Sequence, residues 1–196
     1  MKNTQTKIKH ITVFCGSSFG SEEMYAAQAY LLGATLAKKK ITLVYGGANV
    51  GLMGAVANGA LDAKGKVIGV LPDFLKEKEI AHSNLTELII TKTMHQRKVK
   101  MNELSDGVIA LPGGFGTLEE FFEMLTWGQL GLHKKPMGIL NINGFYDELI
   151  NLTQTMVNKG FLKKQNKEML LISSNIDELI DMMENYKAST IGKWIK

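Results

Sequence analysis

Short, continuously apolar runs alternate along the chain with longer segments whose apolar residues recur every three or four positions. The first pattern is typical of strands buried on both faces, and the second of amphipathic helices. Strands are expected over residues 8–15, 41–45, 67–71, 88–91, 108–111, 137–141 and 170–172. Helices are expected over residues 21–39, 93–104, 118–130, 145–157 and 176–186, with another opening within 46–54. Residues 73–84 show no clear period and are expected to form a loop or a short helix.

This alternation predicts an α/β protein, namely a Rossmann-like, doubly wound parallel sheet with helices on both faces. The length of 196 residues suits one domain with a sizeable core. We expect a single Rossmann-like domain over residues 1–196, with loose tails at 1–7 and 188–196. Ligands in such folds bind beyond the carboxyl ends of the strands.

One glycine-rich stretch lies where the fifth apolar run meets a helix, and it reads LPGGFGTLEE over residues 111–120. Glycine tolerates positive φ and has no side chain to block the approach of another group. The backbone N–H groups of such a turn, with a helix N-terminus behind them, form a site for an anion, most often a phosphate. The candidate contacts are Gly113, Gly114, Phe115, Gly116 and Thr117.

Glu120 lies one helical turn after Thr117 and on the same face. Phosphate binding does not explain a carboxylate there, because like charges repel. Glu120 is therefore expected to face another part of the ligand, or a cation. Acidic residues that serve only the helix dipole would account for Glu119 and Glu120, but not for three glycines and a threonine together.

Two more turns of small residues follow the first and second expected strands, Gly16–Ser18 and Gly46–Gly54. In a parallel sheet these turns should meet the glycine-rich stretch at one edge, so Ser17, Gly46 and Gly47 are candidate substrate contacts. The glycine spacing is not that of the dinucleotide fingerprint. No Walker A lysine follows either glycine turn, which argues against hydrolysis of nucleoside triphosphates.

Arg97 and Lys98 share a helix face with Met94 and Met101, and the methionines indicate that this face points inward. An unpaired cation on a buried face is costly, so the two side chains either reach water along their stems or meet anionic groups in a pocket. Arginine suits two-point contact with a phosphate or carboxylate. We favour the pocket, because the glycine turns already call for a phosphate.

Charge and composition narrow the classes of ligand and of protein that remain possible. The net charge of +4 comes with scattered lysines and small clusters at 38–40 and 163–164, which favours small anionic ligands over nucleic acid. The single cysteine, Cys15, ends an apolar run and is expected to be a small buried residue rather than a nucleophile. No group of His, Cys or acidic residues has metal-ligand spacing, and His95 is expected to be structural. With no membrane-spanning run, signal peptide or possible intramolecular disulfide, we expect a cytoplasmic protein.

The motif PGGFGTLEE over residues 112–120 resembles the PGGxGTxxE motif of the Lonely Guy (LOG) proteins. The stretches MHQRK (94–98), GLMG (51–54) and TWGQLG (126–131) are also similar to that family. The resemblance extends from about residue 11 to about residue 173. LOG proteins are cytokinin riboside 5′-monophosphate phosphoribohydrolases, although many have been labelled lysine decarboxylases. The sequence offers no lysine-bound pyridoxal site that would support that label.

The resemblance implies hydrolysis of the N-glycosidic bond of a purine nucleoside 5′-monophosphate, with release of the base and ribose 5-phosphate. It matches Arg97 and Glu120 to the family's catalytic pair. Glu120 would stabilise the positive charge that develops on the ribose, as carboxylates do in glycosidases. Arg97 would contact the phosphate or pair with Glu120.

By the same resemblance, Lys98 matches a substrate-contacting position, and Glu79 and Thr126 are further substrate contacts. Asp106 and Glu79 are candidate proton donors to the leaving base. The implied assembly is a homodimer, and no cofactor or metal is implied. No contact with nucleic acid or membrane is expected.

Two rival hypotheses use the same fold. A non-catalytic nucleotide-binding protein would need the glycine turns and Arg97, yet it would gain nothing from Glu120. A structural dimer with a degenerate site is disfavoured because Arg97 and Glu120 are both present. The sequence leaves open whether the base is adenine or an N6-prenylated adenine, and whether the product serves hormone signalling or nucleotide salvage.

Overall fold

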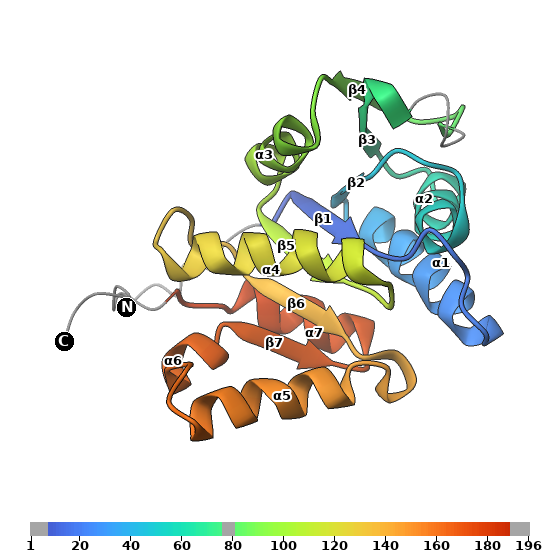
Figure 1. Ribbon diagram of the computed structural model, residues 1–196. Helices are drawn as coiled ribbons and strands as arrows, with labels where there is room; N and C mark the ends of the chain where they lie inside the picture. Colours follow the sequence, from blue (N-terminus) through green and yellow to red (C-terminus); the bar gives the residue numbers. More distant parts are fainter. Residues whose placement is uncertain (1–7, 76–80, 189–196) are drawn as a thin grey trace, which may run out of the picture.

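The computed structural model describes residues 8–75 and 81–188, and their centre is one seven-stranded parallel sheet (Figure 1). The strand order is β4-β3-β2-β1-β5-β6-β7. This arrangement confirms the predicted α/β class with a doubly wound sheet. The strands are β1 (His10–Phe14), β2 (Thr42–Tyr45), β3 (Val67–Pro72), β4 (Glu87–Thr91), β5 (Gly107–Ala110), β6 (Met137–Leu140) and β7 (Leu170–Ser173).

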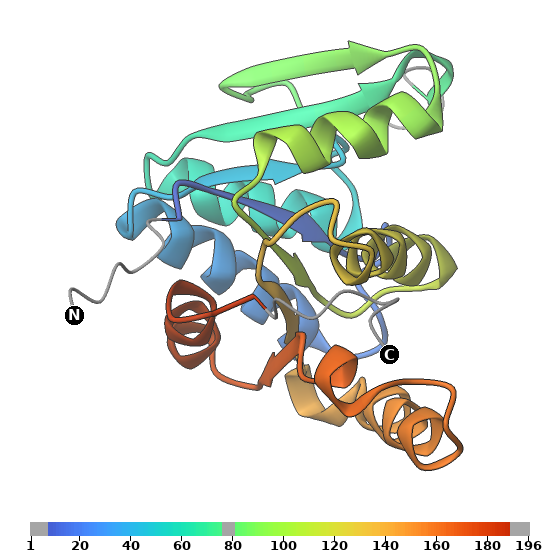
Figure 2. The same ribbon diagram turned by 90° about the vertical axis from the view of Figure 1, so that its left-hand side faces the viewer.

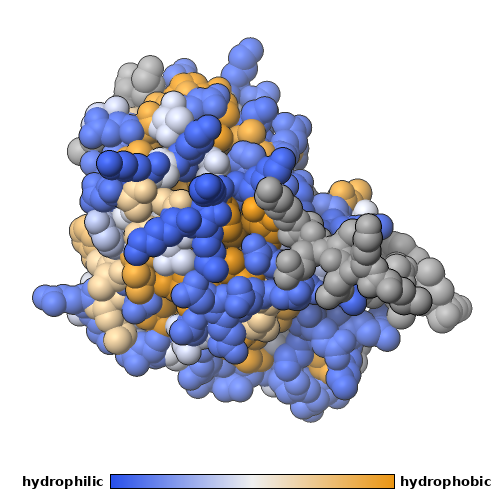
Figure 3. All heavy atoms as spheres, turned by 180° about the vertical axis from the view of Figure 1, so that it is seen from behind, coloured by the Kyte–Doolittle hydropathy of each residue, from blue (hydrophilic) through white to orange (hydrophobic). Residues whose placement is uncertain are grey.

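Helices cover both faces of the sheet, with α1, α2 and α7 on one face and α3, α4 and α5 on the other (Figures 1 and 2). Seen from behind, the first face shows hydrophilic side chains over most of its surface, with apolar ones between them (Figure 3). The helices are α1 (Glu23–Lys38), α2 (Gly51–Asp62), α3 (Met94–Leu104), α4 (Phe115–Gln129), α5 (Asp147–Asn158), α6 (Lys164–Lys167) and α7 (Ile176–Glu184), with 3₁₀ turns η1 (Asp73–Leu75) and η2 (Ile142–Gly144).

Strands β5 and β6 are apolar at every position because helices remove both of their faces from water. Every residue of β5 and β6 is buried, and Ile11 and Ile109 are fully inaccessible. Strand β4 lies at the edge of the sheet, where Leu88 and Ile90 stay partly exposed. Burial at about 25 cal/mol per Å² of apolar surface makes this two-sided core the main stabilising term.

The strand order reverses at β1, which pairs with β2 on one side and β5 on the other. The N–H of Leu111 donates to the Phe14 carbonyl at 2.9 Å, and the N–H of Gly16 donates to the Pro112 carbonyl at 3.0 Å. These bonds hold together the turns that follow β1 and β5. The crevice at such a reversal point is where ligands bind in open α/β sheets.

The predicted elements differ from the observed ones mainly at their ends. The first strand begins at His10 rather than at residue 8, since its pairing with β2 starts at His10. The segment 73–84 begins with the 3₁₀ turn η1, and an isolated bridge joins Ala81 to Ala48. The short helix α6 was not predicted, because four residues are too few to show a period. The predicted tails at 1–7 and 188–196 lie outside the described residues, except for residue 188.

Four helices end in the same C-terminal hydrogen-bonding motif, with one residue in the left-handed region just after the cap. In α4 and α5 that residue is glycine, Gly131 (φ 81°) and Gly160 (φ 79°). In α1 and α2 it is lysine, Lys40 and Lys64, each at φ 60°. A left-handed residue other than glycine costs roughly 1–2 kcal/mol, so these two lysines are placed against the local preference of the backbone.

No helix in residues 8–75 and 81–188 is both long enough and apolar enough to cross a membrane. Within the same residues, no three His, Cys, Asp or Glu side chains are grouped so that they could hold a metal ion.

Candidate active site

The glycine-rich stretch forms the turn between β5 and α4. Helix α4 starts at Phe115 with Gly114 as its N-cap, and its first hydrogen bond runs from the N–H of Leu118 to the Gly114 carbonyl. The N–H groups before Leu118 therefore have no acceptor within the helix. Thr117 is only 5% exposed and lies at the base of the turn. The turn has the free donors and the helix dipole that an anion site needs.

Different physical constraints account for glycine at the three positions of this turn. A Cβ on Gly113 would collide with the Thr117 side chain, so packing demands glycine there. A Cβ on Gly114 or Gly116 would meet nothing within 4 Å. Packing of the chain itself does not explain these two glycines, whereas close approach of a ligand to the backbone does. Phe115, between them, is 95% exposed.

Replacing Gly116 by alanine should weaken nucleotide binding without harming the fold. Alanine has a higher helix propensity than glycine, so we expect thermal stability to be unchanged or about 1 kcal/mol higher. The new methyl group would stand where a phosphate approaches, and KM should rise about tenfold or more. Steady-state kinetics and thermal unfolding check both parts. The matched variant Gly113→Ala should instead lose stability, and an unchanged KM in Gly116→Ala would contradict phosphate binding at this turn.

The turn after β1 is locked against the start of α2. The N–H of Leu52 donates to the Gly16 carbonyl at 3.1 Å. Gly51 has φ 53°, and a Cβ there would collide with the backbone of Ser17. Ser17 itself is exposed at the crevice. Its role as a substrate contact stays a prediction, and the structure brings it to the same edge as the glycine-rich turn.

Packing within the protein accounts for the two glycines of the turn after β2. A Cβ on Gly46 would collide with the guanidinium of Arg97, so this glycine makes room for the arginine. Gly47 has φ 84° and packs against Leu71 and Leu88. Both were predicted as substrate contacts, and that prediction remains untested. The contacts present in the structure are with the protein itself.

Arg97 is only 7% exposed, and both ends of its guanidinium are engaged. Its Nε donates to the carbonyl of Val70 in β3, at 3.1 Å. Its Nη1 lies 3.2 Å from Oε1 of Glu120 on α4, and the two side chains are 8% and 12% exposed. Arg97 therefore does not reach out to water along its stem; it forms a buried ion pair. The ion pair holds the Glu120 side chain next to the glycine-rich turn, as its helical spacing from Thr117 predicted.

Lys98, next to Arg97 on α3, is held by two other acids of α4. Its Nζ lies 2.6 Å from Glu119 Oε1 and 2.9 Å from Glu123 Oε2. Burial lowers the pKa of Lys98, but the hydrogen bonds to Glu119 and Glu123 outweigh burial, and the net shift is upward. The lysine therefore remains charged and braces α3 against α4. A direct contact with substrate stays a prediction for this residue.

Cys15 lies behind the ion pair, at the end of β1. Burial raises the pKa of its thiol, the nearby charge of Glu120 raises it further, and Arg97 opposes both. A thiol that stays protonated is a poor nucleophile. This agrees with the expectation that Cys15 is not a nucleophile, and its side chain is partly buried against the core rather than fully buried.

A cleft of about 360 Å³ adjoins the glycine-rich turn. Three aromatic rings contribute to it, and Tyr25 and Phe145 meet edge-on at 5.9 Å between centroids. The sequence analysis predicted Ser17, Gly113 and Gly114 but missed the aromatic part of this lining, because those residues come from distant segments with no shared motif. The lining residues are Gly16, Ser17, Ser18, Phe19, Gly20, Tyr25, Leu52, Pro112, Gly113, Gly114 and Phe145.

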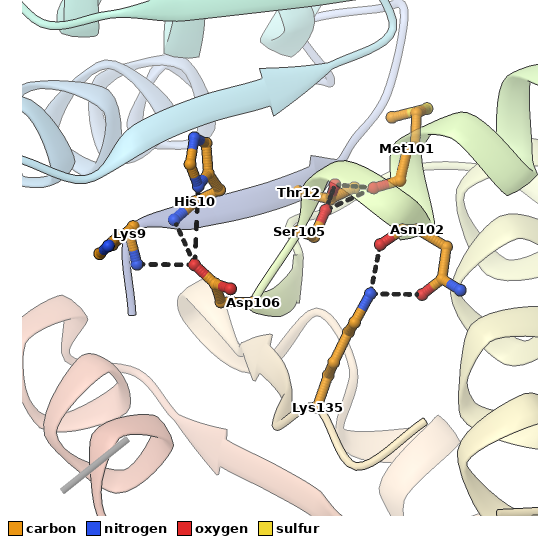
Figure 4. A network of polar contacts seen from close by, with 8 residues as sticks. All are labelled: Lys9, His10, Thr12, Met101, Asn102, Ser105, Asp106 and Lys135. Carbon is orange, nitrogen blue, oxygen red and sulfur yellow. Dashed lines mark hydrogen bonds and ion pairs between the residues drawn. The ribbon is translucent and has the colours of Figure 1, made fainter. Parts of the chain in front are cut away.

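The outcome differs for three further residues that were predicted to act at the site: Thr126, Glu79 and Asp106. Thr126 is exposed on α4, where its hydroxyl donates to the Phe122 carbonyl at 2.7 Å; its role toward substrate stays untested. Glu79 lies outside the described residues. The prediction of Asp106 as a proton donor was wrong, because Asp106 directly precedes the amino end of β5, whereas the crevice lies beyond the carboxyl ends of the strands. Figure 4 shows Asp106 beside Lys9 and His10. There its carboxylate accepts hydrogen bonds from the backbone of Lys9 and His10, at 2.8 and 3.0 Å.

Two histidines have structural partners that the sequence could not identify. Nδ1 of His82 accepts from the N–H of Asn84 at 3.2 Å, and its Nε2 lies 2.9 Å from Asn58 Oδ1. In His133, Nδ1 accepts a backbone N–H and Nε2 donates to the Met124 carbonyl at 2.8 Å. Burial lowers the pKa of both rings from the ordinary 6.5. Both rings are therefore built into the fold in their neutral form.

Stability should fall as the pH is lowered from about 8 to about 5.5. Unfolded histidines take up protons as the pH falls through about 6.5, before the folded ones do, so acid favours the unfolded state. The loss is at most about 1.4 kcal/mol per pH unit for each histidine, and it ends below the folded pKa values. Urea unfolding across this range measures it. A double variant, His82→Asn with His133→Gln, should show a flatter profile, and an equal slope would contradict the assignment.

Comparison with known proteins places this site in a family. A family model described as "Possible lysine decarboxylase" matches residues 53–183. The chain is 41% identical over 186 residues to cytokinin riboside 5′-monophosphate phosphoribohydrolase LOG2 of Arabidopsis thaliana, which covers 95% of this chain and 87% of that one. It is 47% identical over 173 residues to the cytokinin riboside 5′-monophosphate phosphoribohydrolase of Rhodococcoides fascians, with 88% and 87% covered.

Solved structures agree on the fold. The molybdenum cofactor binding protein of Rippkaea orientalis superposes with a TM-score of 0.68 at 26% identity, over 91% of this chain and 97% of that one. The molybdenum cofactor carrier protein of Chlamydomonas reinhardtii gives 0.65 at 20% identity, over 89% and 95%. Together with the matched motifs and the extent of the sequence identity, these findings show that the chain belongs to the LOG family.

Proposed function

We propose that this protein hydrolyses the N-glycosidic bond of a purine nucleoside 5′-monophosphate, releasing the free base and ribose 5-phosphate. The observation that carries the proposal is the buried Arg97–Glu120 ion pair, placed one helical turn from an open glycine turn. A phosphate on that turn would bring the ribose close to the Glu120 carboxylate. Relatives 41–47% identical to this chain are named for the same reaction.

Different residues bind the phosphate of the substrate and stabilise the charge that develops during the reaction. The N–H groups at the start of α4 hold the 5′-phosphate, and Gly114 and Gly116 let it approach the backbone. As the bond to the base breaks, positive charge develops on the ribose. The Glu120 carboxylate stabilises this charge and orients the attacking water, as carboxylates do in glycosidases. Arg97, fixed by the Val70 carbonyl, keeps Glu120 ionised and in place.

The less favoured alternative is a non-catalytic nucleotide-binding protein on the same fold, called the carrier hypothesis below. The likeness to cofactor-binding and carrier proteins reaches only 20–26% identity, well below that to the named phosphoribohydrolases. A carrier would also have no use for a buried carboxylate beside its phosphate site, since that charge repels the ligand.

The finer features of the proposal are a cytoplasmic location, binding of AMP and a homodimeric assembly. Exposed large apolar side chains support the dimer, because such side chains are buried when two subunits associate. They include Phe74, Leu88 and Ile90 around the β4 edge, and Phe115 at the glycine turn. Light scattering coupled to size exclusion measures the assembly directly.

The test is product release from AMP and from isopentenyladenosine 5′-monophosphate, side by side, with Glu120→Gln as the blank. Free base from either substrate that disappears in the variant would support the hydrolase, and the ratio of the two rates would name the preferred base. If neither substrate yields base while AMP still binds tightly, the carrier hypothesis replaces the enzyme.

A further inference from the structure

A second cavity lies at the opposite edge of the sheet from the candidate active site. Its volume is about 490 Å³, and it opens at the amino ends of β1, β2 and β3, where α1 and α2 terminate. Its charged lining comes from three separate segments: Lys9 and His10 before and in β1, Lys40 between α1 and β2, and Lys64 and Lys66 between α2 and β3.

The four lysines of this cavity are exposed and have no ion-pair partner among the described residues. Among the ion pairs within residues 8–75 and 81–188, none involves Lys9, Lys40, Lys64 or Lys66. Asp106 is the acid next to the cavity, and its carboxylate lies against the backbone N–H groups at the start of β1 and 3.6 Å from the His10 ring (Figure 4). Four ammonium groups around one concavity repel one another unless an anion enters.

The backbone shows that two of these lysines are placed against local preference. Lys40 and Lys64 occupy the left-handed position that closes α1 and α2, the position that Gly131 and Gly160 take in α4 and α5. Thus the two helices that end at the cavity carry lysine where the two others carry glycine. Lys40 and Lys64 both line the cavity, so the strained positions that close these two helices carry positive charge at the cavity.

Compensation of the helix dipole does not account for Lys40. Helix α1 already carries Lys38 in its last turn and Lys39 at its cap, both in unstrained conformations. Lys39 pairs with Asp177 at 3.3 Å, while Lys40 has no such partner among the described residues. Lys40 therefore adds positive charge to the cavity and does not serve only to compensate the dipole at the end of α1.

We propose that this cavity is a second binding site, for a compact oligophosphate. Lysine is a point-charge ligand for phosphate oxygens, and several lysines from different segments suit a multivalent anion rather than a single carboxylate. The volume accommodates a ligand of nucleotide size. The site is separate from the glycine turn, because it lies at the opposite ends of the same strands.

The experiment titrates inorganic triphosphate into the full-length protein by isothermal calorimetry at low ionic strength. The test variant is Lys40→Gly with Lys64→Gly, which relieves the left-handed strain while it removes two charges. The control is Lys134→Gln with Lys159→Gln, which removes two exposed charges elsewhere. We expect the test variant to bind at least about tenfold more weakly, with an unchanged or higher Tm, and the control to bind like the wild type.

Three results would overturn the proposal. Equal affinity of the wild type and the test variant would place triphosphate at the glycine turn alone. Equal weakening in the control would mean that only net charge matters. Binding of a single-stranded oligonucleotide through the two lysines, without binding of triphosphate, would identify a nucleic-acid surface instead. Lys40→Asn with Lys64→Asn serves as a second test pair, because asparagine also tolerates the left-handed region.

Discussion

Replacing Glu120 by glutamine should reduce turnover by roughly a thousandfold while the protein stays folded. The amide has the shape of the carboxylate but no charge, so it cannot stabilise the positive ribose in the transition state. Its oxygen can still accept a hydrogen bond from Nη1 of Arg97, now 3.2 Å from the carboxylate. Substrate binding should persist, because the glycine turn that holds the phosphate is untouched.

The kinetic constants separate this interpretation from a structural one. A loss confined to kcat, with KM nearly unchanged, is the result expected for a group that acts only in the transition state. Thermal unfolding of the variant should stay close to that of the wild type. A variant that turns over at the full rate would remove Glu120 from the mechanism, and a large drop in Tm would assign the carboxylate a mainly structural role.

Much of the fold could be predicted because its strongest signal is local. Strands buried on both faces must be apolar at every position, and β5 and β6 are so in the structure. The ends of elements were less predictable. The start of β1 depends on where β2 offers a partner, and α6 is a single turn between exposed residues.

The candidate site was predictable as far as neighbouring residues and the topology rule extend. Helical spacing placed Glu120 beside Thr117, and the rule for parallel sheets brought the turns after β1, β2 and β5 to one edge. The Arg97–Glu120 contact joins α3 to α4, and its anchor is the carbonyl of Val70 in β3. A backbone acceptor leaves no trace in the identity of a residue, so this anchor was not predictable.

Asp106 shows the limit of reasoning from residue type. An acid just ahead of the strand that leads to the glycine turn was a plausible proton donor. A strand, however, separates its two ends by its full length. The structure places Asp106 at the amino end of β5, bound to the backbone of Lys9 and His10. The prediction failed because Asp106 and the glycine turn lie at opposite ends of β5, although they are close in sequence.

Replacing Arg97 by alanine should have the largest combined effect, on both activity and stability. The Arg97 side chain is 8% exposed, and its loss leaves the Glu120 carboxylate buried without this partner and removes a donor from the Val70 carbonyl. Breaking a buried ion pair from one side costs about 3–5 kcal/mol. We expect a Tm lower by about 10 °C or more and turnover reduced at least about a hundredfold.

A double variant distinguishes the electrostatic role of Arg97 from its catalytic one. In Arg97→Met with Glu120→Gln, no buried charge of the pair remains, so stability should recover relative to Arg97→Met alone. Activity should not recover, because the chemistry needs the carboxylate and the arginine together. Urea unfolding and product assays on the single and double variants measure both quantities. If Arg97→Met kept its turnover and lost only stability, Arg97 would be a structural ion-pair partner, and Glu120 would act without its help.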